Sequence, residues 1–247
     1  MMRRLSGLAA LALLFMTGTA SAFDDTGGRK YTSPQNFAIE VRFGPYKPQV
    51  DQEPALNGAT PYAGTFGSAP RLLPAIEFDW QALRIPWVGS LGPGVSIGYT
   101  KMSAASTTLT TPPQPSGDTT SLTILPMTLV AVLRADSLWR NFGIPLVPYA
   151  KVGFGYALWN ATNTGIISDA FGVKGRGHSF GTNLALGLAF ALNVFEPEAS
   201  RSMDIASGIN NTYVFAEAYW LALNGFGSSS TLRVGSNTWT AGLAFEF

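Results

Sequence analysis

The feature that most constrains this chain is an alternation of bulky apolar residues with small residues, repeated in eight segments. Neighbouring side chains of a β-strand point to opposite faces, so each segment predicts a strand with one bulky apolar face and one small face. In the clearest segment, the bulky set is Phe180, Leu184, Leu186, Leu188, Phe190 and Leu192, and the small set is Gly181, Asn183, Ala185, Gly187, Ala189 and Ala191. The eight segments are 37–44, 73–80, 95–100, 121–134, 149–158, 180–192, 212–221 and 239–247.

The small faces decide between two kinds of β-protein. A soluble sandwich would turn its bulky residues inward and carry a polar, well-charged outer face, whereas small residues fit the narrow lumen of a closed barrel. Charged residues make up only 13% of the chain, against about 25% in a typical soluble domain. Charges within the predicted strands fall on the small face: Glu40, Arg42, Glu77, Asp79, Lys151 and Glu246. The exception, Lys101, is at a strand end, from where its side chain can reach the lipid headgroups.

The pattern therefore predicts an all-β fold over residues 36–247. We expect a closed antiparallel transmembrane β-barrel of about eight strands, connected as an up-and-down meander, with the bulky rows facing lipid. The fourth segment is apolar on both faces, and the seventh is also ambiguous, so the phase of these two strands stays open.

The start of the chain is typical of a secretory signal peptide. Arg3 and Arg4 precede a short apolar core, and Ala20-Ser21-Ala22 provides a small-residue cleavage site. A membrane anchor is the alternative, but a spanning helix needs about 20 apolar residues. We predict that residues 1–22 are removed and that 23–35 form a periplasmic N-terminal segment.

Eight strands would place both ends of the barrel segment in the periplasm and four long links outside the cell, at 47–69, 103–118, 160–178 and 224–236. A short surface helix is expected at 196–204 on the periplasmic side. Aromatic residues favour membrane interfaces. We expect two girdles or, alternatively, ordinary core packing: Trp80, Trp87 and Trp139 at the inner edge, and Tyr46, Tyr99, Trp159 and Trp220 at the outer edge.

The segment Thr240-Ala241-Gly242-Leu243-Ala244-Phe245-Glu246-Phe247 carries a family resemblance. Its polar residue, its glycine two positions later and its alternating aromatics resemble the assembly signal of outer-membrane β-barrels, in particular Thr240, Gly242, Phe245 and Phe247. The chain as a whole resembles small Gram-negative barrels of the OmpA or OmpW type. This resemblance implies recognition by the barrel-assembly machinery and an outer-membrane location among lipid and lipopolysaccharide.

Catalytic and metal-binding signals are weak. The chain has no cysteine and one histidine, so thiolate chemistry and a histidine-rich metal site are excluded. His178 and Ser179 would suit an acyl-transfer site only if they cooperated, and adjacent strand residues point to opposite faces. We therefore predict no catalytic residues, no metal and no cofactor, and interpret His178 as a solvated loop residue. A formal charge of +1 gives no basic footprint for nucleic acid.

Two groups remain as candidate sites. Lys174 and Arg176 form a basic patch that either contacts lipopolysaccharide phosphates or is simply solvated. A lumen polar network is predicted from Glu40, Arg42, Glu77, Asp79, Lys151 and Glu217. This network either plugs the barrel or lines a narrow polar path, and plugging is favoured because barrels of this size are filled by side chains.

Three functions follow from these alternatives. The favoured one is a monomeric, non-enzymatic outer-membrane barrel that supports the envelope or binds partners through its surface loops. The second is a narrow channel for small or apolar solutes, and the third is a lipid A-modifying enzyme.

Overall fold

The computed structural model describes residues 35–107, 114–170, 172–228 and 231–247. The predicted signal peptide, 1–22, lies outside this part of the chain, as does the predicted segment 23–35 apart from Gln35. The described residues all belong to one compact unit that spans 33–247.

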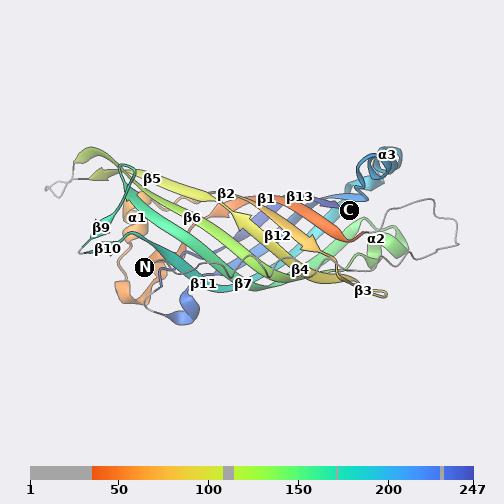
Figure 1. Cartoon of the computed structure of the whole chain (residues 1–247), viewed down its shortest axis with the longest axis horizontal. Coiled ribbons are helices and arrows are strands. Elements are labelled where there is room, and N and C mark those ends of the chain that lie inside the picture. Colours follow the sequence, from red (N-terminus) through yellow and green to blue (C-terminus); the bar gives the residue numbers. More distant parts are fainter. Residues whose placement is uncertain (1–34, 108–113, 171, 229–230) are drawn as a thin grey trace, which may run out of the picture. The chain divides into compact units, whose positions relative to one another are not determined.

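Eight long strands close into an antiparallel barrel, which confirms the predicted fold class (Figure 1). Each strand pairs with the next along the chain, and the last pairs with the first, with Ile39 opposite Phe245. The third barrel strand has two pieces, both paired with the fourth. The barrel strands are β1 (Phe37–Tyr46), β2 (Arg71–Trp80), β4 (Gly89–Gly98) with β5 (Thr100–Thr107), β6 (Pro115–Arg134), β7 (Leu146–Asn163), β11 (Arg176–Ala191), β12 (Asn211–Ala222) and β13 (Ser236–Glu246).

The barrel has two unlike ends. At the terminal end β1 begins and β13 finishes, and the amide of Asn36 donates to the carbonyl of Phe247 at 2.6 Å. This end carries β3 (Leu83–Ile85), α2 (Ser137–Phe142), η3 (Leu192–Val194) and α3 (Pro197–Ser207), the last being the expected surface helix. The opposite, loop end carries η1 (Gln49–Gln52), η2 (Pro54–Leu56), α1 (Pro61–Phe66), β8 (Ile166–Ile167), β9 (Asp169–Ala170), β10 (Val173–Lys174) and η4 (Gly225–Gly227).

None of the helices in the described ranges is long and apolar enough to cross a membrane.

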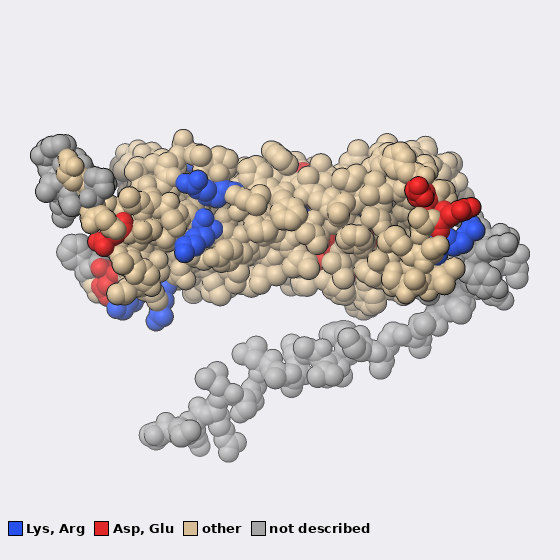
Figure 2. Space-filling model, turned by 90° about the horizontal axis from the view of Figure 1, so that it is seen from above, with Lys and Arg blue, Asp and Glu red and all other residues tan. Residues whose placement is uncertain are grey.

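The outward face of the barrel wall is apolar. Phe43, Val152 and Leu186 are 47%, 61% and 51% exposed, and the same alternation runs along the neighbouring strands. Figure 2 shows charged side chains gathered toward the two ends of the barrel, with a wide band between them that is almost free of charge. Soluble monomers rarely expose such a continuous apolar surface. Closure also pairs the backbone groups of every strand, as a hydrocarbon environment requires.

The prediction that the lumen holds only small or ionised residues is wrong. β6 turns Val130 and Val132 inward, and β12 turns Tyr213, Phe215 and Tyr219 inward. These are the two strands whose phase the sequence left open. A shift of the pairing by one residue would turn every inward charge of a strand toward lipid. The phase of β6 and β12 is therefore fixed by the charges of Arg134 and Glu217 and not by the sizes of the side chains.

Large inward side chains are matched by small ones on the neighbouring strand, and Tyr149 on β7 pairs in register with Gly187 on β11. A Cβ atom on Gly187 would come within 2.2 Å of the ring of Tyr149, so the glycine makes room for the tyrosine. The small face of β11 thus reflects close packing against β7 and β12.

The expected aromatic girdles are correct in part. Tyr99 and Trp220 face outward, with exposures of 49% and 37%, and Trp80 and Trp87 are exposed near the terminal end. The assignment of Tyr46 and Trp159 to the outer girdle is wrong, because both point inward and pack in the apolar cluster near the loop end. Trp139 also packs against an interior cluster.

Candidate functional site

The barrel interior brings the six predicted network residues together. Glu40 and Arg42 come from β1, and Glu77 and Asp79 from the adjacent β2. The other two arrive from across the lumen, Lys151 on β7 and Glu217 on β12. Each of the six is at most 3% exposed, so water cannot supply their solvation. Buried charges are tolerated only when they are paired and hydrogen-bonded.

Lys151 lies among three carboxylates. Its Nζ is 2.6 Å from Oε2 of Glu40, 2.5 Å from Oε1 of Glu77 and 3.6 Å from Oε2 of Glu217. Arg42 bridges a similar set, with Nη2 2.9 Å from Glu40, Nη1 2.9 Å from Glu217, and a further ion pair to Glu77. Two cations thus share three carboxylates, which ties β1, β2, β7 and β12 together across the lumen.

Arg134, the last residue of β6, completes the network. Its Nη2 lies 2.5 Å from Oδ2 of Asp79 and forms an ion pair with Glu40. Arg134 could not be assigned to the lumen from the sequence, because the phase of its segment was unresolved. Thr128 has the same parity as Arg134 and also faces the lumen, so a polar residue at an even position of this segment was the available signal.

Neutral groups saturate the remaining oxygens of Glu217. The hydroxyl of Tyr149 donates to Oε2 at 3.1 Å, and that of Thr240 donates to Oε1 at 2.8 Å. In all, four carboxylates face three cations, which leaves the network one negative charge in excess when every group is ionised. Oδ1 of Asp79 has no hydrogen-bond partner.

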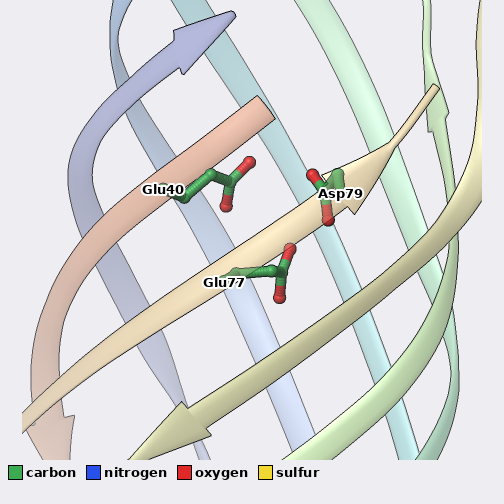
Figure 3. A group of neighbouring side chains, drawn as sticks. All are labelled: Glu40, Glu77 and Asp79. Atoms are coloured by element: carbon green, nitrogen blue, oxygen red, sulfur yellow. The ribbon is translucent and has the colours of Figure 1, made fainter. Parts of the chain in front are cut away.

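Three of the carboxylates form a compact acidic group. Figure 3 shows Glu40, Glu77 and Asp79 projecting from β1 and β2 into the same part of the lumen, and oxygens from the three lie within 4.8 Å of one another. Such a group has the oxygen ligands that a divalent cation prefers. Here Arg42, Arg134 and Lys151 already donate to these carboxylates, so the protein's own cations occupy the place of a metal.

Apolar layers close the lumen on both sides of the network. Toward the loop end, buried apolar side chains pack into one cluster: Tyr46, Leu73, Met102, Leu122, Ile124, Leu221, Leu223 and Val234. Toward the terminal end, a second cluster contains Val147, Tyr149, Tyr213 and Phe215. Beside it, Glu246 accepts hydrogen bonds from Gln81 at 2.7 Å and from Tyr213 at 2.8 Å.

A folded loop covers the mouth at the loop end. The carboxylate of Asp51 accepts hydrogen bonds from the amides of Tyr62 and Ala63, at 2.7 and 2.9 Å, and so caps the first turn of α1. Tyr62 packs into the apolar cluster, and burial raises the pKa of its hydroxyl. An ion pair between Arg233 and Glu53 at 2.9 Å also joins the loop after β1 to the segment before β13, its neighbouring strand.

The space left beside the network is very small. A cavity of about 10 Å³ adjoins Arg42, Tyr219 and Thr240. A volume of this size holds roughly one water molecule.

The predicted basic patch is split by the structure. Lys174 in β10 forms an ion pair with Asp169 at 2.7 Å, whereas Arg176 begins β11 and is exposed. The interpretation of His178 as a loop residue is wrong, because His178 lies within β11 and pairs with Leu158 on β7. His178 and Ser179 point to opposite faces, as expected for neighbours in a strand. His178 stacks on Tyr156 on the outer wall with ring centroids 5.7 Å apart, while Ser179 is buried and donates to the carbonyl of Leu232.

The four residues of the predicted assembly signal lie on β13 and at its end. Thr240 faces the network, and Gly242 lies against β1, where a Cβ atom would come within 1.9 Å of the carbonyl oxygen of Val41. Phe245 pairs with Ile39, and the backbone of Phe247 is hydrogen-bonded to Phe37. All four therefore contribute to barrel closure, whatever their role in recognition.

A closed antiparallel eight-stranded wall with an apolar outer band and an ionic interior defines a class, the small transmembrane β-barrel. No family model and no curated protein matches the chain. Among solved structures, it is similar to Ail, the attachment invasion locus protein of Yersinia pestis, in complex with the heparin analogue sucrose octasulfate. That match has 13% identity and a TM-score of 0.42, and it covers 86% of this chain and 97% of that one.

Two structures from Pseudomonas aeruginosa are also similar. The outer membrane protein OprG matches with 13% identity and a TM-score of 0.46, covering 87% of this chain and 97% of that chain. The N-terminal β-barrel domain of OprF matches with 12% identity and a TM-score of 0.41, covering 86% of this chain and 98% of that chain.

Proposed function

We propose that this chain is a monomeric outer-membrane β-barrel of a Gram-negative cell that works without catalysis. In this proposal the lumen is plugged, the terminal end faces the periplasm, and the loop end presents a binding surface among lipopolysaccharide outside the cell. The signal peptide at 1–22 and the assembly signal at Thr240, Gly242, Phe245 and Phe247 would bring the chain to the outer membrane through the barrel-assembly machinery.

The observation that carries the proposal is the filled interior. An ionic layer is sealed on one side by the cluster around Met102 and Ile124, and on the other by the cluster around Tyr149 and Phe215. Opening a path would require breaking ion pairs that are almost fully buried, and removing one partner of a buried pair costs about 3–5 kcal/mol. The outer wall and the loop end are then the surfaces through which the protein can act.

Orientation can be tested directly because the chain has no native cysteine. Ile166 at the loop end and Ile205 in α3 are matched positions, 75% and 78% exposed, for single cysteine substitutions. A membrane-impermeant maleimide should label Ile166→Cys on intact cells, and Ile205→Cys only after the outer membrane is permeabilised. The reverse pattern would contradict the proposed orientation.

The channel alternative predicts discrete conductance. We expect none from the refolded wild-type barrel in a planar bilayer. Ion-selective openings that change with Lys151→Met would favour the channel, because Lys151 contacts three carboxylates of the lumen network.

The enzyme alternative depends on His178. Its ring stacks on Tyr156 on the outer wall, and the neighbouring serine is buried on the other face, which supports a role without catalysis. His178→Ala should leave the lipid A species of the host cell unchanged by mass spectrometry. A lost or gained acyl chain that depends on His178 would overturn the non-enzymatic proposal.

A further inference from the structure

A row of polar side chains crosses four neighbouring strands on the outer wall near the loop end. Lys101 on β5 pairs in register with Thr123 on β6, which pairs with Asn160 on β7, which pairs with Arg176 on β11. Thr123 is half-buried and the other three are exposed. The row is thus a cation, a hydroxyl, an amide and a second cation on adjacent strands.

These four side chains have no hydrogen-bond or ion-pair partner among the described residues. Nearby cations differ in this respect, since Lys174 is paired with Asp169 and Arg233 with Glu53. The row therefore offers free donors, whereas the neighbouring cations Lys174 and Arg233 are already paired.

The row begins where the apolar wall ends. Directly toward the terminal end lie Tyr99, Leu158 and the stacked pair of His178 with Tyr156. Phe226 of the loop that contains η4 folds against Phe180 on this same wall, with ring centroids 5.6 Å apart. Aromatic residues favour the membrane interface, so Tyr99, two residues from Lys101, marks the boundary between acyl chains and headgroups at the Lys101 end of the row.

The two cations lie at different heights. Lys101 follows Thr100, whose hydroxyl donates a hydrogen bond to the carbonyl of Leu72, close to where β2 begins. Arg176 lies beyond the end of the neighbouring β12, whose last pair with β11 joins Thr182 and Ala222. Strands tilted by about 40° and spaced about 4.8 Å apart would raise the row by about 9 Å over three spacings.

We propose that this row binds the headgroup of lipopolysaccharide along its length. Lys101 contacts a phosphate at the boundary with the acyl chains, Thr123 and Asn160 contact sugar hydroxyls, and Arg176 binds a phosphate or carboxylate further along the saccharide. A guanidinium suits either group because it can donate two parallel hydrogen bonds. A phospholipid with one phosphate would engage Lys101 and leave Arg176 unused. This inference rests on the proposed function, since it requires the loop end to face the lipopolysaccharide leaflet.

Binding to the full barrel in phosphatidylcholine nanodiscs separates the two cations. The probes are lipopolysaccharide with its inner core, lipid A alone and phosphatidylglycerol, counted per barrel by native mass spectrometry. Lys101→Ala should weaken both lipopolysaccharide and lipid A about fivefold, as one cation at an anionic surface would. Arg176→Ala should weaken lipopolysaccharide about fivefold and leave lipid A unchanged, and the double variant should lose about 30-fold for lipopolysaccharide.

Lys47→Ala with Arg201→Ala is the matched control, because both cations are exposed and removing them changes the net charge equally. This control should bind like the wild type. Equal lipopolysaccharide binding by the wild type and the Lys101 and Arg176 variants would overturn the site, as would phosphatidylglycerol binding that depends equally on both cations. Those results would leave the proposed function standing. Labelling of the loop end from the periplasm would contradict both the proposed function and this binding site.

Discussion

Replacing Lys151 by methionine removes one charge from the buried network while keeping the length of the side chain. Lys151 lies 2.6 Å from Glu40, 2.5 Å from Glu77 and 3.6 Å from Glu217 and is 1% exposed. The substitution leaves four carboxylates facing only two cations, Arg42 and Arg134. The excess of negative charge in the lumen doubles, and water cannot reach it.

The expected loss of stability follows from this geometry. Breaking a buried ion pair by removing one partner costs about 3–5 kcal/mol, because the remaining charge is left uncompensated. Arg42 still contacts all three carboxylates that Lys151 abandons, so we expect the lower part of that range, about 3 kcal/mol. Adding Glu77→Gln to Lys151→Met restores the charge balance and should recover at least half of the loss.

Urea unfolding of the barrel in lipid vesicles, followed by tryptophan fluorescence, measures these differences. Lys101→Met is the control, since Lys101 is exposed and has no ion pair with any residue that the structure describes, and it should stay within about 0.5 kcal/mol of the wild type. If Lys151→Met were as stable as Lys101→Met, the network could not be the element that holds the lumen closed.

Two other substitutions test separate parts of the structure. Leu186→Arg should destabilise the inserted barrel by about 2–4 kcal/mol, because its outward position is level with the ionic network and the charge would lie in hydrocarbon. Leu186→Ala should cost clearly less. Heat-modifiable gel mobility compares the two variants, and equal behaviour would argue against a lipid-facing Leu186. Gly242→Val should destabilise the closed barrel by about 1–3 kcal/mol, because its Cβ would meet the carbonyl oxygen of Val41 at 1.9 Å. Unfolding in urea measures this loss of stability. A midpoint equal to that of the wild type would show that β1 and β13 can move apart freely.

Residue patterns predicted the fold well because strand alternation is a local property. The charges at Glu40, Arg42, Glu77 and Asp79 share one parity within two strongly alternating segments, so their burial could be anticipated from sequence alone. The burial of Lys151 could be predicted by the same reasoning from the alternation in the fifth predicted strand.

Packing of inward side chains between strands could not be predicted in the same way. Tyr149 fits because Gly187 lies opposite, and Tyr213 points inward because Glu246 accepts its hydrogen bond. These are contacts between strands, which no single segment encodes. Arg134 was missed for the same reason, since the parity of its strand is fixed by partners on β1 and β2.

Separation of the apolar residues into two environments can be measured without changing the protein. In lipid nanodiscs, methyl groups of an otherwise deuterated barrel should show nuclear Overhauser contacts to acyl chains at Leu184, Leu186 and Leu188. The methyl groups of Leu73, Leu122 and Leu221, which are at most 6% exposed, should show none. Acyl contacts at the second set and not at the first would contradict the assignment of the outer wall.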